Sequence, residues 1–296
     1  MGDAKRPGVV RDAPGPDVAP DAREAWLADA ADGLRSNGVV VLRDAIPRPL
    51  IAAAQAAFKG RQMKRDEGDD RPFQPAPLRP RIAVPLDGPL ADPAIFAPPT
   101  ALALARRLLG EEMIVGELGL VISRPGDGPH ETRRAAIPLF RGGLDVEREV
   151  PPAALTMLAP LGDAPPGAGF PEYWLGSHRT PDKATDTAVP PFQPAFEAGS
   201  VVLCDWRTLY RAGANTSGAA QLALYVSFQR KWLLSLSGAD YKPGLRLPAA
   251  TLKRLPQAYH PLVAWALHQN KTDDVSELVH LWLGRLVKGL QAARGG

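Results

Sequence analysis

The chain has 296 residues, of which 45% are hydrophobic, so it is long enough and apolar enough to bury a globular core. Its net charge of +3 is small, and its Lys and Arg residues are spread along the chain, which argues against a nucleic-acid-binding protein. A single cysteine, Cys204, excludes an internal disulfide and a metal site built from cysteines.

The hydropathy of the chain bears on its location. No stretch approaches the roughly 20 apolar residues that a membrane-spanning helix needs. The first residues also lack the apolar core of a secretory signal. We therefore expect a cytoplasmic protein with no membrane partner and no nucleic-acid partner.

The predicted elements begin after a tail over residues 1–20, which is rich in Pro and Asp and is expected to be disordered. Residues 21–296 are expected to form one domain. Its first helices are predicted over Asp21–Ser36, Pro47–Lys59 and Pro98–Leu109. Asp21 would cap the first of them, and Asn37-Gly38 would end it.

Many short strands are predicted between and after these helices. They cover Val39–Leu42, Glu112–Ser123, Ala153–Leu161, Glu172–Trp174, Gly199–Asp205 and Gln221–Trp232. Long loops are predicted over Gly60–Pro80 and Thr180–Pro194. Together with 32 prolines and 28 glycines, this pattern favours a mainly β fold with flanking helices around a double-stranded β-helix, or jelly-roll, core.

The C-terminal part is predicted to be a helical segment over residues 245–293. Asp274–Leu290 carries an apolar residue at every third or fourth position. This stripe would pack on the protein's own barrel or on a second subunit, which leaves a homodimer open. His260, His268 and His280 have no carboxylate at metal-ligand spacing, so we give them no metal role.

The most informative stretch is Val121–Phe140, which is predicted to form a strand, a Pro-Gly turn, a short polar run and a second strand. In a metal oxygenase such a run would carry a His-x-Asp pair, because side chains two residues apart on a strand reach the same metal. Here no such pair is present, and the polar run offers His130, Glu131, Arg133 and Arg134.

Six motifs between about Gly33 and Trp232 resemble, in order and spacing, those of the phytanoyl-CoA dioxygenase family of iron(II)/2-oxoglutarate oxygenases. They are Gly38–Leu42, Leu108–Gly110, Arg124–Gly126, Gly176–Arg179, Ala198–Leu203 and Ala212–Ser217. The resemblance implies a double-stranded β-helix fold. It also implies that His178, in the fourth motif, is structural.

The resemblance places the family's ligands on residues of another kind. The first iron histidine, its aspartate, the second histidine and the 2-oxoglutarate arginine fall on Arg133, Ala135, Tyr210 and Gln221. A facial triad needs two neutral imidazoles and a carboxylate, and arginine keeps its proton. A slipped register offers only His130 and Thr132. We therefore expect that the protein has no metal ligands here and binds neither iron nor 2-oxoglutarate.

The same positions define an expected pocket. Alternation puts Glu131, Arg133 and Ala135 on one face, and a buried guanidinium there would bind an anionic group. We predict that the proton-transferring residues are His130, Glu131 and Tyr210. We predict that the substrate is bound by Arg133, Arg134, Arg211, Gln221 and Tyr173.

Simpler interpretations of these residues stay open. Arg133 and Arg134 would then lie on a solvated loop, His130 would be an exposed histidine, and Tyr210 would fill the core. Asp205, close to this site, would bind a turn amide or pair with a neighbouring arginine.

Three functions are compatible with the sequence. The first is a cofactor-independent enzyme of secondary (natural-product) biosynthesis, which acts on a small anionic metabolite by acid/base or leaving-group chemistry such as cyclisation or elimination. The second is a non-catalytic protein that binds a ligand or partner. The third is an iron(II)/2-oxoglutarate dioxygenase with atypical ligands.

Overall fold

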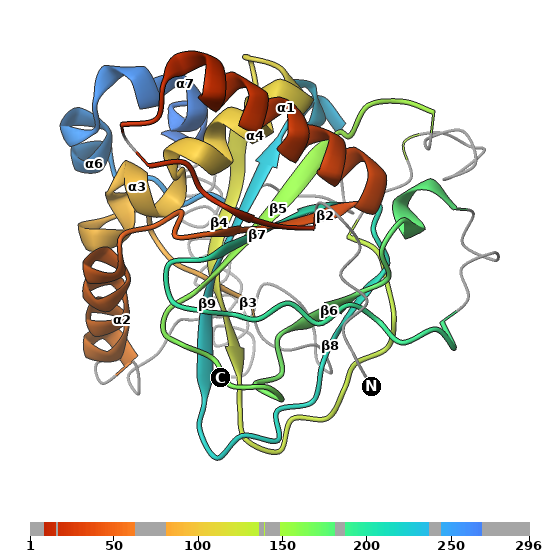
Figure 1. Cartoon of the computed structure of the whole chain (residues 1–296). Helices are drawn as coiled ribbons and strands as arrows, with labels where there is room; N and C mark the ends of the chain where they lie inside the picture. Colours follow the sequence, from red (N-terminus) through yellow and green to blue (C-terminus); the bar gives the residue numbers. More distant parts are fainter. Residues whose placement is uncertain are drawn as a thin grey trace, which may run out of the picture.

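The computed structural model describes residues 9–15, 17–62, 81–135, 139, 149–180, 187–236 and 244–267. At its centre is a seven-stranded sheet with the strand order β1-β2-β7-β5-β9-β4-β3 (Figure 1). The strands are β1 Val10–Asp12, β2 Val39–Arg43, β3 Arg81–Ala83, β4 Ile114–Ser123, β5 Ala154–Pro160, β7 Val201–Asp205 and β9 Gln221–Gln229. Neighbouring strands are antiparallel except β1 and β2, which are parallel.

A smaller antiparallel sheet packs against one face of the large one. It consists of β6, Pro171–Tyr173, and β8, Tyr210–Ala212. The chain before residue 135 runs alongside β8: the amide of His130 donates to the carbonyl of Ala212 at 2.9 Å, and the amide of Arg133 donates to the carbonyl of Tyr210 at 2.8 Å. The two facing sheets confirm the predicted jelly-roll core.

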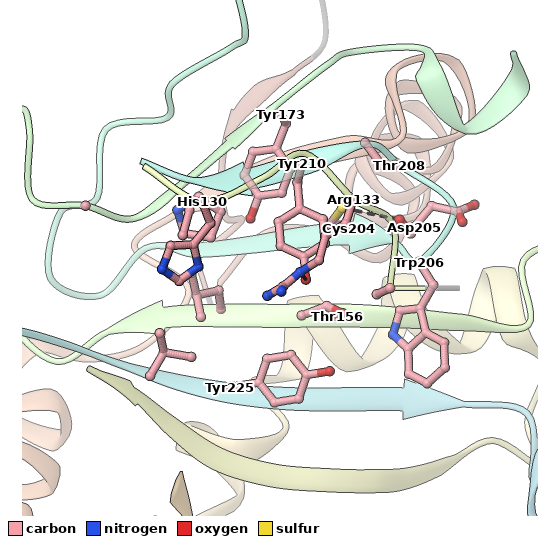
Figure 2. A pocket seen from close by; sticks show the side chains of 16 residues that line it. His130, Arg133, Thr156, Tyr173, Cys204, Asp205, Trp206, Thr208, Tyr210 and Tyr225 are labelled. Carbon is pink, nitrogen blue, oxygen red and sulfur yellow. Dashed lines mark hydrogen bonds between the residues drawn. The ribbon is translucent and has the colours of Figure 1, made fainter. Parts of the chain in front are cut away.

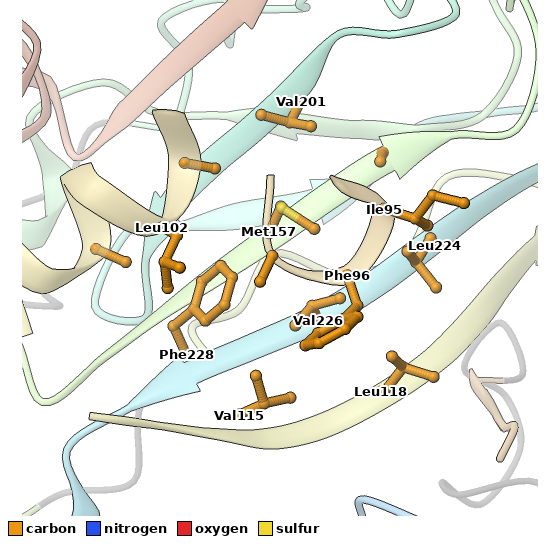
Figure 3. Packing of buried hydrophobic residues seen from close by; sticks show 14 of the residues in the cluster. Ile95, Phe96, Leu102, Val115, Leu118, Met157, Val201, Leu224, Val226 and Phe228 are labelled. Carbon is orange, nitrogen blue, oxygen red and sulfur yellow. The ribbon is translucent and has the colours of Figure 1, made fainter. Parts of the chain in front are cut away.

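Both faces of the large sheet are buried, because side chains alternate along each strand and each face meets an apolar layer. One face packs against the helices, as Figure 3 shows for Met157, Val226 and Phe228. The opposite face meets the small sheet through residues that include Val41, Leu158, Val202, Cys204 and Tyr225. The strands therefore appear in the sequence as continuous apolar runs.

The helices cover the outer face of the large sheet (Figure 1). They are α1 Pro20–Asn37, α2 Arg48–Gln62, η2 Gly88–Ala91, α3 Pro93–Phe96 and α4 Pro99–Leu109. The prediction that Asp21 caps the first helix is wrong: the N-cap is Ala19, without a side-chain hydrogen bond. Asp21 lies in the first turn instead, where a carboxylate interacts favourably with the helix dipole. Gly38 ends α1 as predicted, in the left-handed conformation.

Several short elements differ from the prediction. Val10–Asp12 forms β1, and Trp26 of α1 donates its Nε1–H to the carbonyl of Asp12 at 2.9 Å, so these residues are not part of a loose tail. Strands β3 and β8 and helix α3 have three or four residues each, too few to show a hydrophobic period. The last predicted strand ends at Gln229, and a 3₁₀ helix, η5, Lys231–Leu236, follows it.

The described C-terminal part contains α6 Ala249–Arg254, η6 Gln257–Tyr259 and α7 His260–Val263. Trp265 packs on the core and donates its Nε1–H to the carbonyl of Val115 at 3.0 Å. The helix predicted over 274–290, most of the loop predicted over 60–80, and residues His268 and His280 lie outside the described residues. Within the described ranges, no helix is long and apolar enough to cross a membrane.

Candidate functional site

A cavity of about 60 Å³ lies between the two sheets of the jelly roll. This is room for a few water molecules. Figure 2 shows side chains from both sheets converging on it. Its lining comprises Val121, His130, Arg133, Ala135, Thr156, Leu158, Gly169, Pro171, Tyr173, Cys204, Asp205, Trp206, Thr208, Tyr210, Ala212 and Tyr225.

One wall of the cavity is formed by side chains of the large sheet that point away from the helices. Thr156 of β5, Cys204 of β7 and Tyr225 of β9 occupy the inner face, while the residue before each of them in its strand faces the helices. Burial raises the pKa of the Cys204 thiol well above its ordinary range, which keeps this sulfur protonated. This wall therefore adds hydroxyl and thiol groups but no charge.

Arg133 and Tyr210 form the polar centre of the opposite wall. Their backbones exchange two hydrogen bonds, of 2.8 and 2.9 Å. The Arg133 Nε–H also donates to the Tyr210 hydroxyl at 3.1 Å, and the guanidinium carbon lies 5.5 Å from the centre of the tyrosine ring. Both residues are half-buried. Tyr210 thus holds the guanidinium in one orientation inside the cavity (Figure 2).

His130 and Tyr173 complete the predicted residues that line the cavity. His130 is half-buried and is positioned by the bond from its amide to the carbonyl of Ala212. Tyr173 is 4% exposed and comes from β6, where it pairs with Tyr210 at a ring-centre distance of 6.4 Å. Four predicted site residues therefore meet in one cavity: His130, Arg133, Tyr173 and Tyr210.

Asp205 is the only carboxylate that lines the cavity among the described residues, and it is fully engaged. Arg207 contacts both of its oxygens, with Nε–H at 3.0 Å and an Nη–H at 2.7 Å, and donates its own amide at 2.9 Å. Both residues are more than 90% buried. This confirms the simpler interpretation of Asp205 as a partner of a turn amide and of an arginine. Its charge is neutralised, so Arg133 gives the cavity a net positive charge.

The other predicted site residues lie outside the lining. Glu131 is exposed. Arg134 donates to the carbonyls of Ser177, at 2.7 Å, and of Arg207, and so ties two loops together. Arg211 pairs with Glu172 at 2.7 Å. Gln221 starts β9 opposite Ser123, on the same face as Tyr225 but beyond the cavity.

Sequence reasoning missed much of the lining. Thr156 and Tyr225 could have been found from strand alternation, because each lies between residues that face the helices. Trp206 and Thr208 lie in the turn between β7 and β8, which has no period to interpret.

Comparison with known proteins agrees with this geometry. The phytanoyl-CoA dioxygenase (PhyH) family model matches residues 34–222, well over half of the chain. The chain belongs to the PhyH family. A search among functionally curated proteins finds none that matches.

Solved structures similar to this PhyH-family chain share its fold. The alpha-ketoglutarate-dependent epimerase SnoN from nogalamycin biosynthesis has a TM-score of 0.55 at 20% identity, over 77% of this chain and 95% of that one. The carbocyclase SnoK from the same biosynthesis has a TM-score of 0.53 at 20% identity, over 79% and 95%. AviO1 from Streptomyces viridochromogenes Tue57 has a TM-score of 0.54 at 19% identity, over 69% and 95%.

The expectation that the protein binds neither iron nor 2-oxoglutarate is contradicted by these relatives. SnoN has been solved in complex with Fe3+ and alpha ketoglutarate, at a TM-score of 0.54 to this chain. Membership of the PhyH family also counts against that expectation.

The donors in the described PhyH-family cavity nevertheless do not fit the iron of such a centre. The cavity offers one imidazole, His130, and one carboxylate, Asp205, which already binds Arg207. No group of three or more His, Cys, Asp or Glu side chains within the described ranges could hold a metal ion. The described residues therefore do not supply the two imidazoles and the carboxylate of a facial triad.

Proposed function

We propose that this protein is an enzyme of natural-product biosynthesis that binds a small anionic metabolite, or the anionic end of a larger one, in the jelly-roll cavity. The observation that carries the proposal is the guanidinium of Arg133. It lines the cavity, is oriented by Tyr210, and has no carboxylate partner among the described residues. A guanidinium fork matches the oxygens of a carboxylate, sulfate or phosphate. The similarity to SnoN and SnoK, enzymes of nogalamycin biosynthesis, supports the pathway class.

The cavity offers groups for proton transfer next to this anion site. An anion bound by Arg133 would lie between the Tyr210 hydroxyl and the His130 imidazole (Figure 2). Histidine exchanges protons near neutral pH, and a phenol can donate one. Cyclisation, elimination and loss of an anionic leaving group each need a proton moved and negative charge stabilised, which these three side chains supply.

A second candidate function is a reaction that depends on iron(II) and 2-oxoglutarate. The complex of SnoN with Fe3+ and alpha ketoglutarate favours it. For this reason the binding and turnover measurements that test the proposed function are made both on protein as purified and on protein loaded anaerobically with iron(II) and 2-oxoglutarate. Iron content and 2-oxoglutarate binding by calorimetry decide whether the second candidate applies.

The first prediction tests the anion site. Acetate, succinate, 2-oxoglutarate, sulfate and phosphate are titrated into the protein by calorimetry at constant ionic strength. We expect at least one of them to bind, and Arg133→Gln to weaken that binding about tenfold or more, because a charge-assisted bidentate contact is lost. Arg124→Gln removes the same charge from an exposed residue outside the cavity and should leave the affinity unchanged.

Turnover of natural-product intermediates that carry the bound anionic group then tests the catalytic part. Tyr210→Phe should lower it roughly 10²-fold if the hydroxyl transfers a proton. Binding that responds equally to Arg124→Gln and Arg133→Gln, or that responds to neither, would show that the cavity is not the anion site. Binding lost only in Arg133→Gln, without turnover under either loading condition, would leave a binding protein in place of an enzyme.

A further inference from the structure

A second and larger cavity, of about 550 Å³, lies beyond the Asp205–Arg207 pair. We call it the arginine cleft. Its lining comprises Leu34, Arg35, Arg107, Leu108, Gly110, Glu149, Val150, Pro151, Pro152, Leu155, His178, Arg179, Asp205, Arg207 and Arg230. Its volume falls in the usual range of small-molecule sites.

Five guanidinium groups line the cleft, and they come from separate parts of the chain. Arg35 belongs to α1, Arg107 to α4, Arg179 to η3 (Ser177–Arg179), Arg207 to the turn after β7, and Arg230 to the junction between β9 and η5. The lining holds two carboxylates, Glu149 and Asp205, so its formal charge is +3. Such convergence is typical of sites that bind oxyanions.

The arginines differ in how much of their charge is already compensated. Arg207 is bound by Asp205. Arg230 is fixed by the carbonyls of Pro152 and Leu108, both at 3.0 Å, and no carboxylate among the described residues pairs with it. Arg179 is exposed, and its side chain has no hydrogen-bond or ion-pair partner within the described part of the chain.

The two remaining arginines have partners that are exposed to solvent. Arg107 binds Glu24, whose side chain is 62% exposed, and Arg35 binds Asp32, whose side chain is 74% exposed. Exposed ion pairs contribute little energy and exchange readily. An anion in the cleft could therefore recruit both guanidinium groups at low cost.

We propose that the arginine cleft binds a phosphate-bearing small molecule, with Arg179 and Arg230 as the principal contacts to its phosphate oxygens. One guanidinium can bind both oxygens of a carboxylate. A phosphate ester or diphosphate presents more oxygens and two or more negative charges, so it can be bound by several converging arginines. The remaining volume is bordered by Leu34, Leu108 and Leu155, so the organic part would meet an apolar wall. Among the described residues, no Phe, Tyr or Trp side chain lines the cleft.

The site is tested with inorganic pyrophosphate as the probe, titrated into the full-length protein by calorimetry at constant ionic strength. We expect one pyrophosphate per chain, and roughly tenfold weaker binding in Arg179→Gln and in Arg230→Gln. Arg179→Gln is the safer of the two variants, because it breaks no contact that the structure shows. Arg254→Gln, an exposed arginine on α6 that lines neither cavity, removes the same charge and should bind as the wild type does.

Other outcomes would reject the proposal. Absence of stoichiometric binding, or equal weakening in Arg254→Gln, would reduce the cleft to a diffuse basic surface. Weakening in Arg133→Gln but not in Arg179→Gln would move the anion into the jelly-roll cavity. If pyrophosphate binds as predicted, phosphate esters with aliphatic and with nucleoside bodies are compared next, and tighter binding of the aliphatic esters is expected from the apolar wall.

Discussion

Gly38 shows how one residue holds two distant segments together. It joins α1 to β2 at a backbone φ of +74°, and a Cβ built there would lie 2.4 Å from the Thr208 hydroxyl oxygen and 2.5 Å from Nδ1 of His178. Thr208 in turn donates to the Gly38 carbonyl at 3.0 Å. The turn that carries two cavity residues, Trp206 and Thr208, is therefore packed directly against this glycine.

Gly38→Ala should accordingly destabilise the fold by about 2–5 kcal/mol, the sum of left-handed backbone strain and overpacking. The matched control is Gly88→Ala, where φ is also positive, at +52°, but nothing lies within 4 Å of the added carbon. That control carries the backbone cost alone, about 1–2 kcal/mol. Urea denaturation of the two variants measures the difference. Equal losses would mean that the turn gives way to the added methyl group.

The Asp205–Arg207 pair separates the two cavities and lines the arginine cleft on one side. Asp205→Asn would remove the carboxylate that contacts the buried Arg207 guanidinium, and we expect a loss of about 3–5 kcal/mol in the free energy of unfolding. Asp32→Asn breaks a solvent-exposed pair with Arg35 and should cost less than about 1 kcal/mol. A small effect at Asp205, measured by the same denaturation, would show that water reaches Arg207 and that the partition is open.

At the scale of elements, strand β9 contributes to both layers of the molecule. Phe228 is fully buried against the helices on one face, while Tyr225 faces the jelly-roll cavity on the other. Phe228→Ala should cost about 3–5 kcal/mol through the cavity it leaves. Val189→Ala, at a side chain that is 50% exposed, should change stability by less than about 0.5 kcal/mol. If Phe228→Ala behaves like Val189→Ala, the helices do not depend on this strand for their packing.

The elements also show where pattern reasoning succeeds and where it stops. Long strands such as β4 and β9 and the helix α1 were predicted to within a few residues, because nine or more residues are enough to show a period and an end signal. Strands β1 and β8 escaped prediction because three residues owe their conformation to the strand beside them. Their pairing is a property of the whole fold.

The whole molecule determines which predicted residues reach the cavity. Arg133 and Tyr210 are 77 residues apart in the sequence and meet only because two sheets face each other. The ordered motifs of the family resemblance made that meeting predictable, whereas composition did not. Strict alternation wrongly placed Glu131 on the same face as Arg133. The residues just before Arg133 run beside β8 and are held by separate hydrogen bonds, so they do not form a regular strand. Trp206 has no sequence signal, since its position depends on the turn that packs on Gly38.

A buried histidine couples the stability of the whole molecule to pH. His178 is 3% exposed, and its Nε2–H donates to the carbonyl of Arg35 at 2.8 Å, which leaves Nδ1 without a partner among the described residues. Burial lowers the pKa of His178 from its ordinary value of about 6.5, and this effect exceeds the opposing attraction of Asp205. His178 therefore binds a proton less readily in the native state than in the unfolded chain.

It follows that the stability contributed by neutral His178 is complete above about pH 6.5 and declines as the pH falls from there toward the folded-state pKa. The slope from this one group cannot exceed about 1.4 kcal/mol per pH unit. Urea denaturation at pH 7.5, 6.5 and 5.5 should show the wild type losing more stability over that range than His178→Gln, whatever the absolute stability of the variant. Parallel pH profiles would mean that other titratable groups account for the loss of stability in acid. They would also mean that water reaches His178 between α1 and the turn after β7.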